Sequence, residues 1–289
     1  MKICIKCHHH FNHLDWKCPS CGYIPPSIQG HLTFAPELAA KSVGFEAEFF
    51  PILAQLESKN FWFRSRNRLI IYAIKHYFPH AQNFLEIGCG TGFVLQGIEK
   101  HLPHLITSGS EIFTTGLQFA TDRLCKTTLF QMDARNIPFA EEFDIIGAFD
   151  VLEHIEQDED VLKEMYQAIP IGGGIILTVP QHPWLWSQAD TYAHHVRRYT
   201  KQDLVTKLQQ TGFTIVKVTS FVSLLLPLML ISRINSRSNS KDYDPTSELK
   251  IGGFLNYLLE KILDIETWFI KLGFSFPWGG SLLVIAYKK

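Results

Sequence analysis

A glycine-rich turn at residues 88–92 constrains this chain more than any other feature. An apolar stretch at 83–87 precedes it and predicts a buried strand, while the residues after it have a helical pattern. Gly88, Gly90 and Gly92 stand at alternate positions, where glycine adopts backbone angles that are costly for other residues. Such a turn lets a ligand lie against the main chain, with N–H groups of the next helix directed at it. The plainer alternative is a glycine loop that binds nothing.

Strand and helix patterns alternate from residue 80 to the end of the chain. This alternation predicts an α/β domain with a mostly parallel sheet and right-handed crossovers. We expect strands at 83–87, 105–110, 127–132, 143–149, 174–179, 213–218 and 281–287.

Acidic residues stand at or next to the ends of the first four expected strands. They are Glu86, Glu111, Asp133 and Asp150. Ligands of open α/β sheets bind beyond the carboxyl ends of the strands, so we expect these side chains to converge on one crevice. Four acids in that arrangement favour a binding site over a solvated surface.

The run Leu85-Glu86-Ile87-Gly88-Cys89-Gly90-Thr91-Gly92, with these acids, resembles the class I S-adenosylmethionine (SAM) dependent methyltransferases. A dinucleotide fingerprint, G-x-G-x-x-G, would need its third glycine where Phe93 stands. The resemblance implies a Rossmann-like sheet of seven strands with helices on both faces. It also implies a SAM site in which Glu111 binds the ribose, Asp133 and Ala134 the adenine, and Asp150 the methionine portion. The implied cofactor-binding residues are Glu86, Gly88, Cys89, Gly90, Gly92, Glu111, Asp133, Ala134 and Asp150.

Two histidines are candidates for a general base if the acceptor is a hydroxyl. His154 ends the run Val151-Leu152-Glu153-His154, which resembles the group of these enzymes that methylates small molecules. His195 lies in a loop expected to cross the acceptor side of the crevice. The segment from Trp184 to Phe213 resembles a bacterial subgroup of type 11/12 methyltransferases. The alternative role for each histidine is a structural hydrogen bond.

Four cysteines in the first 21 residues form two C-x-x-C pairs: Cys4 with Cys7, and Cys18 with Cys21. Two such knuckles complete a tetrahedral site, and the segment resembles a small zinc ribbon. Two disulfides are the alternative, disfavoured because no secretory signal is apparent. Because so short a segment cannot bury a core of its own, we expect the zinc to be structural.

We expect three regions: a zinc ribbon at 1–30, a helical linker or cap at 31–79, and a SAM-dependent methyltransferase domain at 80–289 with a helical insertion at 220–280. Residues 23–36, with two prolines and a glycine, predict a linker. In the cap, Arg64, Arg66 and Arg68 either contact substrate or form a solvated face.

Composition bears on partners and location. The net charge of −1 over 289 residues provides no basic excess for a large nucleic-acid footprint. The apolar run 221–231 is too short to span a membrane and favours at most a peripheral membrane contact. The expected function is methyl transfer to a small-molecule or lipid-linked acceptor by a cytoplasmic enzyme. The alternatives are an RNA methyltransferase, disfavoured because no D-P-P-Y type sequence follows strand 4, and a non-catalytic SAM-binding scaffold.

Overall fold

The computed structural model describes residues 1–39, 49–236 and 250–289 of the chain. Within these ranges the main sheet has nine strands in the order β10-β11-β9-β8-β5-β6-β7-β4-β3. Their bounds are β3 Ser27–Ile28, β4 His31–Thr33, β5 Asn83–Ile87, β6 Ile106–Glu111, β7 Thr128–Gln131, β8 Ile145–Phe149, β9 Gly174–Pro180, β10 Phe213–Phe221 and β11 Ser281–Lys288.

The seven predicted strands are contiguous in this sheet, from β10 to β7, which confirms the α/β fold. Strands β4 to β9 pair in parallel wherever they are neighbours, whereas β11 runs antiparallel to both β9 and β10. Strands β5 and β8 are adjacent although helices and two other strands separate them in sequence. Their carboxyl ends therefore lie at the topological switch point, where an open α/β sheet binds its ligand.

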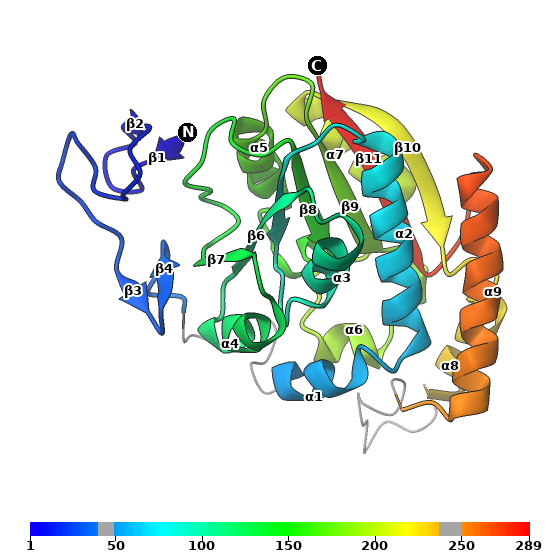
Figure 1. Ribbon diagram of the computed structural model, residues 1–289. Helices are drawn as coiled ribbons and strands as arrows, with labels where there is room; N and C mark the ends of the chain where they lie inside the picture. The colour runs from blue at the N-terminus through cyan, green and yellow to red at the C-terminus, as the bar shows by residue number, and fades with distance from the viewer. Residues whose placement is uncertain (40–48, 237–249) are drawn as a thin grey trace.

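Helices cover both faces of the sheet (Figure 1). One core contains apolar residues of α5 Asp158–Ala168 and α7 Lys201–Thr211. The other contains residues of α2 Phe61–Tyr77, α3 Phe93–His101, α4 Thr114–Arg123 and α9 Gly253–Lys271. Side chains of β5 alternate between these cores, with Phe84 in one and Leu85 in the other, because successive residues of a strand point to opposite faces.

The segment predicted as a linker at 23–36 is instead partly regular. Strands β3 and β4 form a hairpin, and β4 extends the sheet by pairing with β7. A boundary at residue 30 would fall in the turn of this hairpin and separate its two strands. Sequence periodicity could not reveal strands of two and three residues, which are held by pairing with a distant partner.

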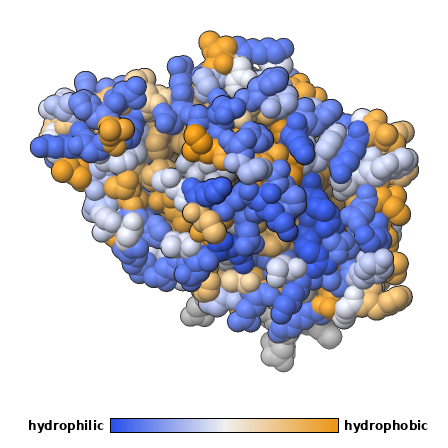
Figure 2. Space-filling view, in the orientation of Figure 1, coloured by the Kyte–Doolittle hydropathy of each residue, from blue (hydrophilic) through white to orange (hydrophobic). Residues whose placement is uncertain are grey.

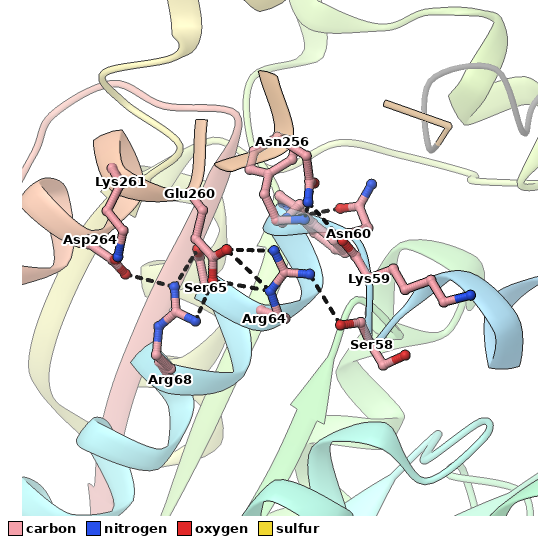
Figure 3. Close-up of polar contacts among 12 residues, drawn as sticks. Ser58, Lys59, Asn60, Arg64, Ser65, Arg68, Asn256, Glu260, Lys261 and Asp264 are labelled. Carbon is pink, nitrogen blue, oxygen red and sulfur yellow. Dashed lines mark hydrogen bonds and ion pairs between the residues drawn. The ribbon is translucent and has the colours of Figure 1, made fainter. Parts of the chain in front are cut away.

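The cap and the insertion pack against each other. The insertion comprises α8 Leu226–Ser236 and α9, with residues 237–249 outside the described range. Arg64 and Arg68 of α2 both bind Glu260 of α9, and Arg68 also binds Asp264 at 2.6 Å (Figure 3). The Asn256 side chain accepts from the backbone N–H of Phe61 and donates to the Lys59 carbonyl. Two of the three predicted basic cap residues therefore hold α9 in place.

The cysteine module, which contains the hairpin β1 Lys2–Ile3 and β2 His10–Phe11, packs against the segment that follows β7. The backbone N–H of Ile3 donates to the Pro138 carbonyl at 2.9 Å. The Trp16 ring lies 4.6 Å from that of Phe34 and 5.5 Å from that of Phe139, measured between centroids. An aromatic cluster thus joins the module to the domain core.

Candidate functional site

The glycine turn follows β5 and leads into α3 as predicted. Gly88 has a φ of 67°, and a Cβ there would lie 2.5 Å from Cγ2 of Val151. Gly90 has a φ of 53°, but a Cβ there would meet only the Phe50 ring at 3.8 Å. Gly88 is therefore required for close packing against the segment after β8, whereas Gly90 leaves its backbone accessible to a ligand.

Glu111 is fixed at the end of β6 beside this turn. Its carboxylate accepts from the N–H of Gly90 at 3.0 Å, of Ile112 at 2.8 Å and of Phe113 at 3.3 Å. Burial raises the pKa of this carboxyl, and the three backbone donors partly offset that effect. The structure thus joins the predicted acid Glu111 and the glycine turn in one hydrogen-bonded unit.

Asp133 and Ala134 follow β7 on the neighbouring side of the crevice. Asp133 is half-buried and binds the guanidinium of Arg135 through both carboxylate oxygens. Ala134 is buried. The backbone N–H of Met132 donates to the Glu111 carbonyl, so the ends of β6 and β7 stay in register next to the glycine turn.

Asp150, at the end of β8, has a left-handed backbone with a φ of 59°. Such strain in a non-glycine residue costs about 1–3 kcal/mol and gathers at functional sites. Its carboxylate forms an ion pair with Arg66, which reaches down from α2. The guanidinium of Arg66 also lies 4.4 Å from the Trp62 ring centroid. Arg66 is therefore the one predicted basic cap residue that turns into the crevice.

Glu86 is almost fully buried next to Arg66. Burial raises its pKa well above the ordinary value, the positive charge of Arg66 opposes this, and the nearby Glu57 and Glu111 add to it. One Glu86 oxygen and the Nε of Arg66 are buried without a hydrogen-bond partner. The Glu86 carboxyl group and the Arg66 guanidinium thus lie near each other, and each has one atom that could still form a hydrogen bond.

Helix α1, Phe49–Leu56, and the residue after it cover the outer side of the turn (Figure 1). The buried Phe50 ring stands over Gly90 and Gly116. Glu57 accepts from the Thr91 hydroxyl at 2.6 Å and from Arg123 at 2.8 Å. The cap is therefore attached to the turn itself as well as to the insertion.

The structure brings the two predicted histidines together on the other side of Asp150. His154 ends the short helix η1, Leu152–His154, and His195 follows α6, Gln188–Tyr192. Their rings lie 4.7 Å apart and nearly perpendicular. Nδ1 of His195 lies 3.0 Å from Oδ1 of Asp190, and its Nε2 lies 4.0 Å from Oε1 of Glu153.

The environments of these two rings differ. Burial, together with the positive charge of His195, lowers the pKa of His154 to about 3, so His154 is a weak proton acceptor. Burial tends to raise the pKa of Asp190, but the His195 hydrogen bond and Arg198 hold it below its ordinary value. Asp190 therefore stays ionised and orients the His195 ring, which makes His195 the stronger candidate for a role in catalysis.

Neighbouring arginines are engaged in ion pairs of the fold. Arg198 is buried, binds Asp190 at 2.7 Å and donates to the Gln181 carbonyl. Arg197 binds Asp158 at 2.6 Å. These contacts attach the segment 188–199 to α5 and to the residue after β9.

The four N-terminal cysteines converge on one point. Sγ of Cys4 lies 3.6 Å from that of Cys21, and the same distance separates Cys7 from Cys18. All four thiols lie within 4.8 Å of one another, and none forms a disulfide. A tetrahedron with zinc–sulfur bonds of about 2.3 Å has edges of about 3.8 Å. The cluster is consistent with a zinc ribbon.

A family model described as a methyltransferase domain matches residues 54–218, more than half of the chain. The chain belongs to this methyltransferase family. It is a SAM-dependent methyltransferase, with the fold and the enzyme class that the sequence predicted. None of the helices in the described ranges is long and apolar enough to cross a membrane.

One curated protein and several solved structures are similar to this chain. The chain is 23% identical over 147 residues to 2-methyl-6-phytyl-1,4-hydroquinone methyltransferase 1 of Oryza sativa subsp. japonica, which covers 49% of this chain and 44% of that protein. The chain thus spans less than half the length of this relative. Among solved structures, the [4+2]-cyclase SpnF superposes with a TM-score of 0.56 at 14% identity, covering 84% of this chain and 93% of that one.

Two further solved structures have a similar fold. Phosphoethanolamine N-methyltransferase 2 of Haemonchus contortus, in complex with SAM, superposes with a TM-score of 0.52 at 16% identity, covering 86% and 61% of the two chains. A SAM-dependent methyltransferase from Archaeoglobus fulgidus superposes with a TM-score of 0.50 at 15% identity, covering 83% and 99%. At these identities the likeness concerns the fold alone.

Sequence reasoning did not distinguish Arg66 from Arg64 and Arg68, and it missed Glu153 and Asp190 as residues of the site. A signal existed for Arg66, because it shares the apolar stripe of α2 with Phe63 and Ile70, whereas Arg64 and Arg68 do not. Glu153 and Asp190 carried no such signal, since ionisable residues are usually exposed and only tertiary packing shows these two to be buried.

Proposed function

We propose that this enzyme transfers a methyl group from SAM to a small, lipid-linked acceptor. One observation supports this acceptor class above all. Arg233 of α8 reaches Asp190 at 3.3 Å, and Asp190 also orients His195. An amphipathic helix with an exposed apolar side therefore borders the acceptor side of the crevice.

The exposed side of the insertion is strongly apolar (Figure 2, right-hand edge). On α8, Leu228 and Ile231 are more than half exposed. On α9 and the segment after it, the exposed large apolar residues are Phe254, Leu255, Tyr257, Leu258, Ile265, Trp268, Leu272, Phe274 and Trp278. Aromatic residues of this kind sit well at a membrane interface, so we place the peripheral membrane contact here. In the predicted run 221–231, Phe221, Val222 and Leu225 are buried instead.

The comparisons support the same acceptor class. The rice relative is named for a phytyl hydroquinone, a small ring on a long apolar chain. An acceptor of this kind would present its reactive head to His195 while its chain lies along α8. The predicted alternatives, RNA and a scaffold without activity, gain no support from this apolar surface.

The residues of the crevice fit SAM. The uncrowded backbone at Gly90 and the fixed carboxylate of Glu111 suit the ribose, and Asp133 with Ala134 suits the adenine, as the sequence predicted. Because Arg66 Nε and one Glu86 oxygen lack partners, we assign the methionine carboxylate to Arg66 and the methionine amino group to Glu86 and Asp150. Bound here, SAM supplies a methyl group activated by the sulfonium. Glu86, Asp150 and Arg66 would hold the methionine end of the donor, on the side of Asp150 where the histidine pair stands.

We further propose that Cys4, Cys7, Cys18 and Cys21 hold a structural zinc. The ribbon has its own small core of Phe11 with Cys4 and Cys18, which is too small to be stable without metal. It docks on residues 130–140, next to Asp133. We keep the ribbon as a separate module but extend the methyltransferase domain to include β3 and β4.

Labelled SAM incubated with a cell extract tests the acceptor class. We expect label in the lipid fraction with the wild-type enzyme and a loss of at least about tenfold with His195→Ala, whose SAM affinity should be unchanged. Label in RNA, or in water-soluble molecules alone, would refute the lipid-linked acceptor. No label in any fraction would favour the scaffold.

A further inference from the structure

Three side chains beside the acceptor side of the crevice converge as metal ligands do. Glu153, His154 and His195 each offer one ligand atom, and these atoms all lie within 4.8 Å of one another. They come from η1 and from the loop after α6, about 40 residues apart in sequence. Tertiary packing, and not the spacing of these residues in the sequence, therefore brings His195 to Glu153 and His154.

Glu153 is the most unusual member. It is 0% exposed, and neither of its carboxylate oxygens has a hydrogen-bond partner. Burial of a polar group without a partner costs several kcal/mol, and a charged one more, so natural proteins pair such groups or use them to bind metals. The two carboxylate oxygens of Glu153 are thus buried with no hydrogen-bond donor from the described protein.

His195 is oriented as a metal ligand. An ionised carboxylate only accepts hydrogen bonds, so the 3.0 Å contact with Asp190 places the proton on Nδ1. Nε2 then carries the lone pair and faces Glu153 at 4.0 Å, too far for a hydrogen bond and suited to an ion between them. A carboxylate behind a histidine is the usual support of a metal-bound imidazole. Arg198 and the N–H of Ser187 hold Asp190 in turn.

We propose that Glu153, His154 and His195 bind a divalent cation, which takes an oxygen acceptor in its open coordination positions. Two imidazoles and a carboxylate suit Mn²⁺, Fe²⁺, Co²⁺ or Zn²⁺, and leave positions for water or substrate oxygens. This site rests on the proposed function, because it gains its role from the methyl donor next to Asp150. His195 then acts on the acceptor through the ion.

The chemistry balances without any further reagent. The cation lowers the pKa of the acceptor hydroxyl, whose proton passes to water. The resulting oxygen forms a bond to the methyl carbon while the carbon–sulfur bond breaks, and its electron pair remains on the sulfur of S-adenosylhomocysteine. The specific expectation is therefore an O-methyltransferase, with a hydroxyl or a hydroquinone-like head group as the acceptor.

Binding of Mn²⁺, followed by electron paramagnetic resonance, tests the site directly. The full-length protein keeps its N-terminal zinc, because four thiolates favour zinc over manganese. We expect one Mn²⁺ per wild-type chain and a rise in Kd of at least about tenfold in Glu153→Gln and His195→Ala. His194→Ala is the matched control, since this exposed neighbour lies outside the cluster and should leave Mn²⁺ binding unchanged.

The outcomes separate this site from the proposed function. Wild-type protein that binds neither Mn²⁺ nor a second zinc, or equal losses in His194→Ala and His195→Ala, would overturn the site. Full methyl transfer by protein dialysed free of all metal except the N-terminal zinc would overturn it too, while leaving the proposed function intact. Calorimetry with SAM confirms that Glu153→Gln and His195→Ala are folded, because both should keep wild-type SAM affinity.

Discussion

Replacement of Arg66 by methionine tests the assignment of the methionine end of SAM. The Arg66 side chain is 10% exposed and stands between Asp150 and the buried Glu86. Methionine matches only the aliphatic part of the arginine side chain, so it removes the guanidinium with its charge, its donors and its contact with the Trp62 ring. The variant therefore tests the guanidinium while an apolar stem stays in place.

The expected loss follows from the kind of bond removed. A hydrogen bond to a charged group contributes about 1.5–3 kcal/mol, and about 1.4 kcal/mol corresponds to a factor of ten. Arg66 already pairs with Asp150 in the free protein, so only its remaining donors serve the ligand. We expect the Kd for SAM to rise by about 30-fold, which corresponds to about 2 kcal/mol.

Calorimetric titration with SAM and with methylthioadenosine distinguishes a direct contact from a general disturbance. Methylthioadenosine lacks the amino-acid portion, so its affinity should be the same in the variant and the wild type. Arg68→Met is the control, because Arg68 is 42% exposed and pairs with α9. Unchanged SAM affinity in Arg66→Met, or an equal loss for both ligands, would refute the assignment.

Three other predictions follow from single contacts. Glu111→Ala should raise the Kd for SAM by at least about 100-fold in calorimetry, because it removes the ribose acceptor and leaves the N–H of Gly90 without its partner; a smaller change than in Arg66→Met would contradict the ribose assignment. Cys18→Ser should abolish the zinc found by elemental analysis and expose Trp16 to a fluorescence quencher, whereas Cys125→Ser, at an exposed cysteine outside the cluster, should change neither. Arg64 and Arg68 lower the pKa of Glu260 from its ordinary value of 4.5 to about 2. The ion pairs of Glu260 therefore stabilise the fold fully above pH 4.5, and this stabilisation is lost as the pH falls from 4.5 toward 2. The difference in unfolding free energy between wild type and Glu260→Gln, at most about 1 kcal/mol at pH 6, should therefore shrink on acidification; a difference that is constant with pH would show that the ion pairs contribute nothing.

The local features of this chain could be predicted from its sequence. The expected strand at 83–87 is β5, and the expected strand at 281–287 is β11 to within one residue. These elements depend on short-range periodicity and on backbone preferences that act within a few residues. The cysteine cluster is equally local, since each C-x-x-C knuckle already directs two thiols to one point. The methyltransferase class could be predicted because the glycine turn and the acids at the strand ends resemble those of that family, and both can be recognised in the sequence.

Only the tertiary structure decided which charged residues belong to the site. Arg64, Arg66 and Arg68 look equivalent in the sequence, yet a turn of 100° per residue sends Arg66 to Asp150 and the other two to α9. Glu153 and His195 meet because β8 and the loop after α6 pack together, and burial then deprives Glu153 of partners. The physical reason is that burial and charge pairing are set by contacts between distant segments. The sequence by itself predicted a methyl-donor site at the glycine turn, and the packing decided which side chains stand around Asp150 and the histidine pair.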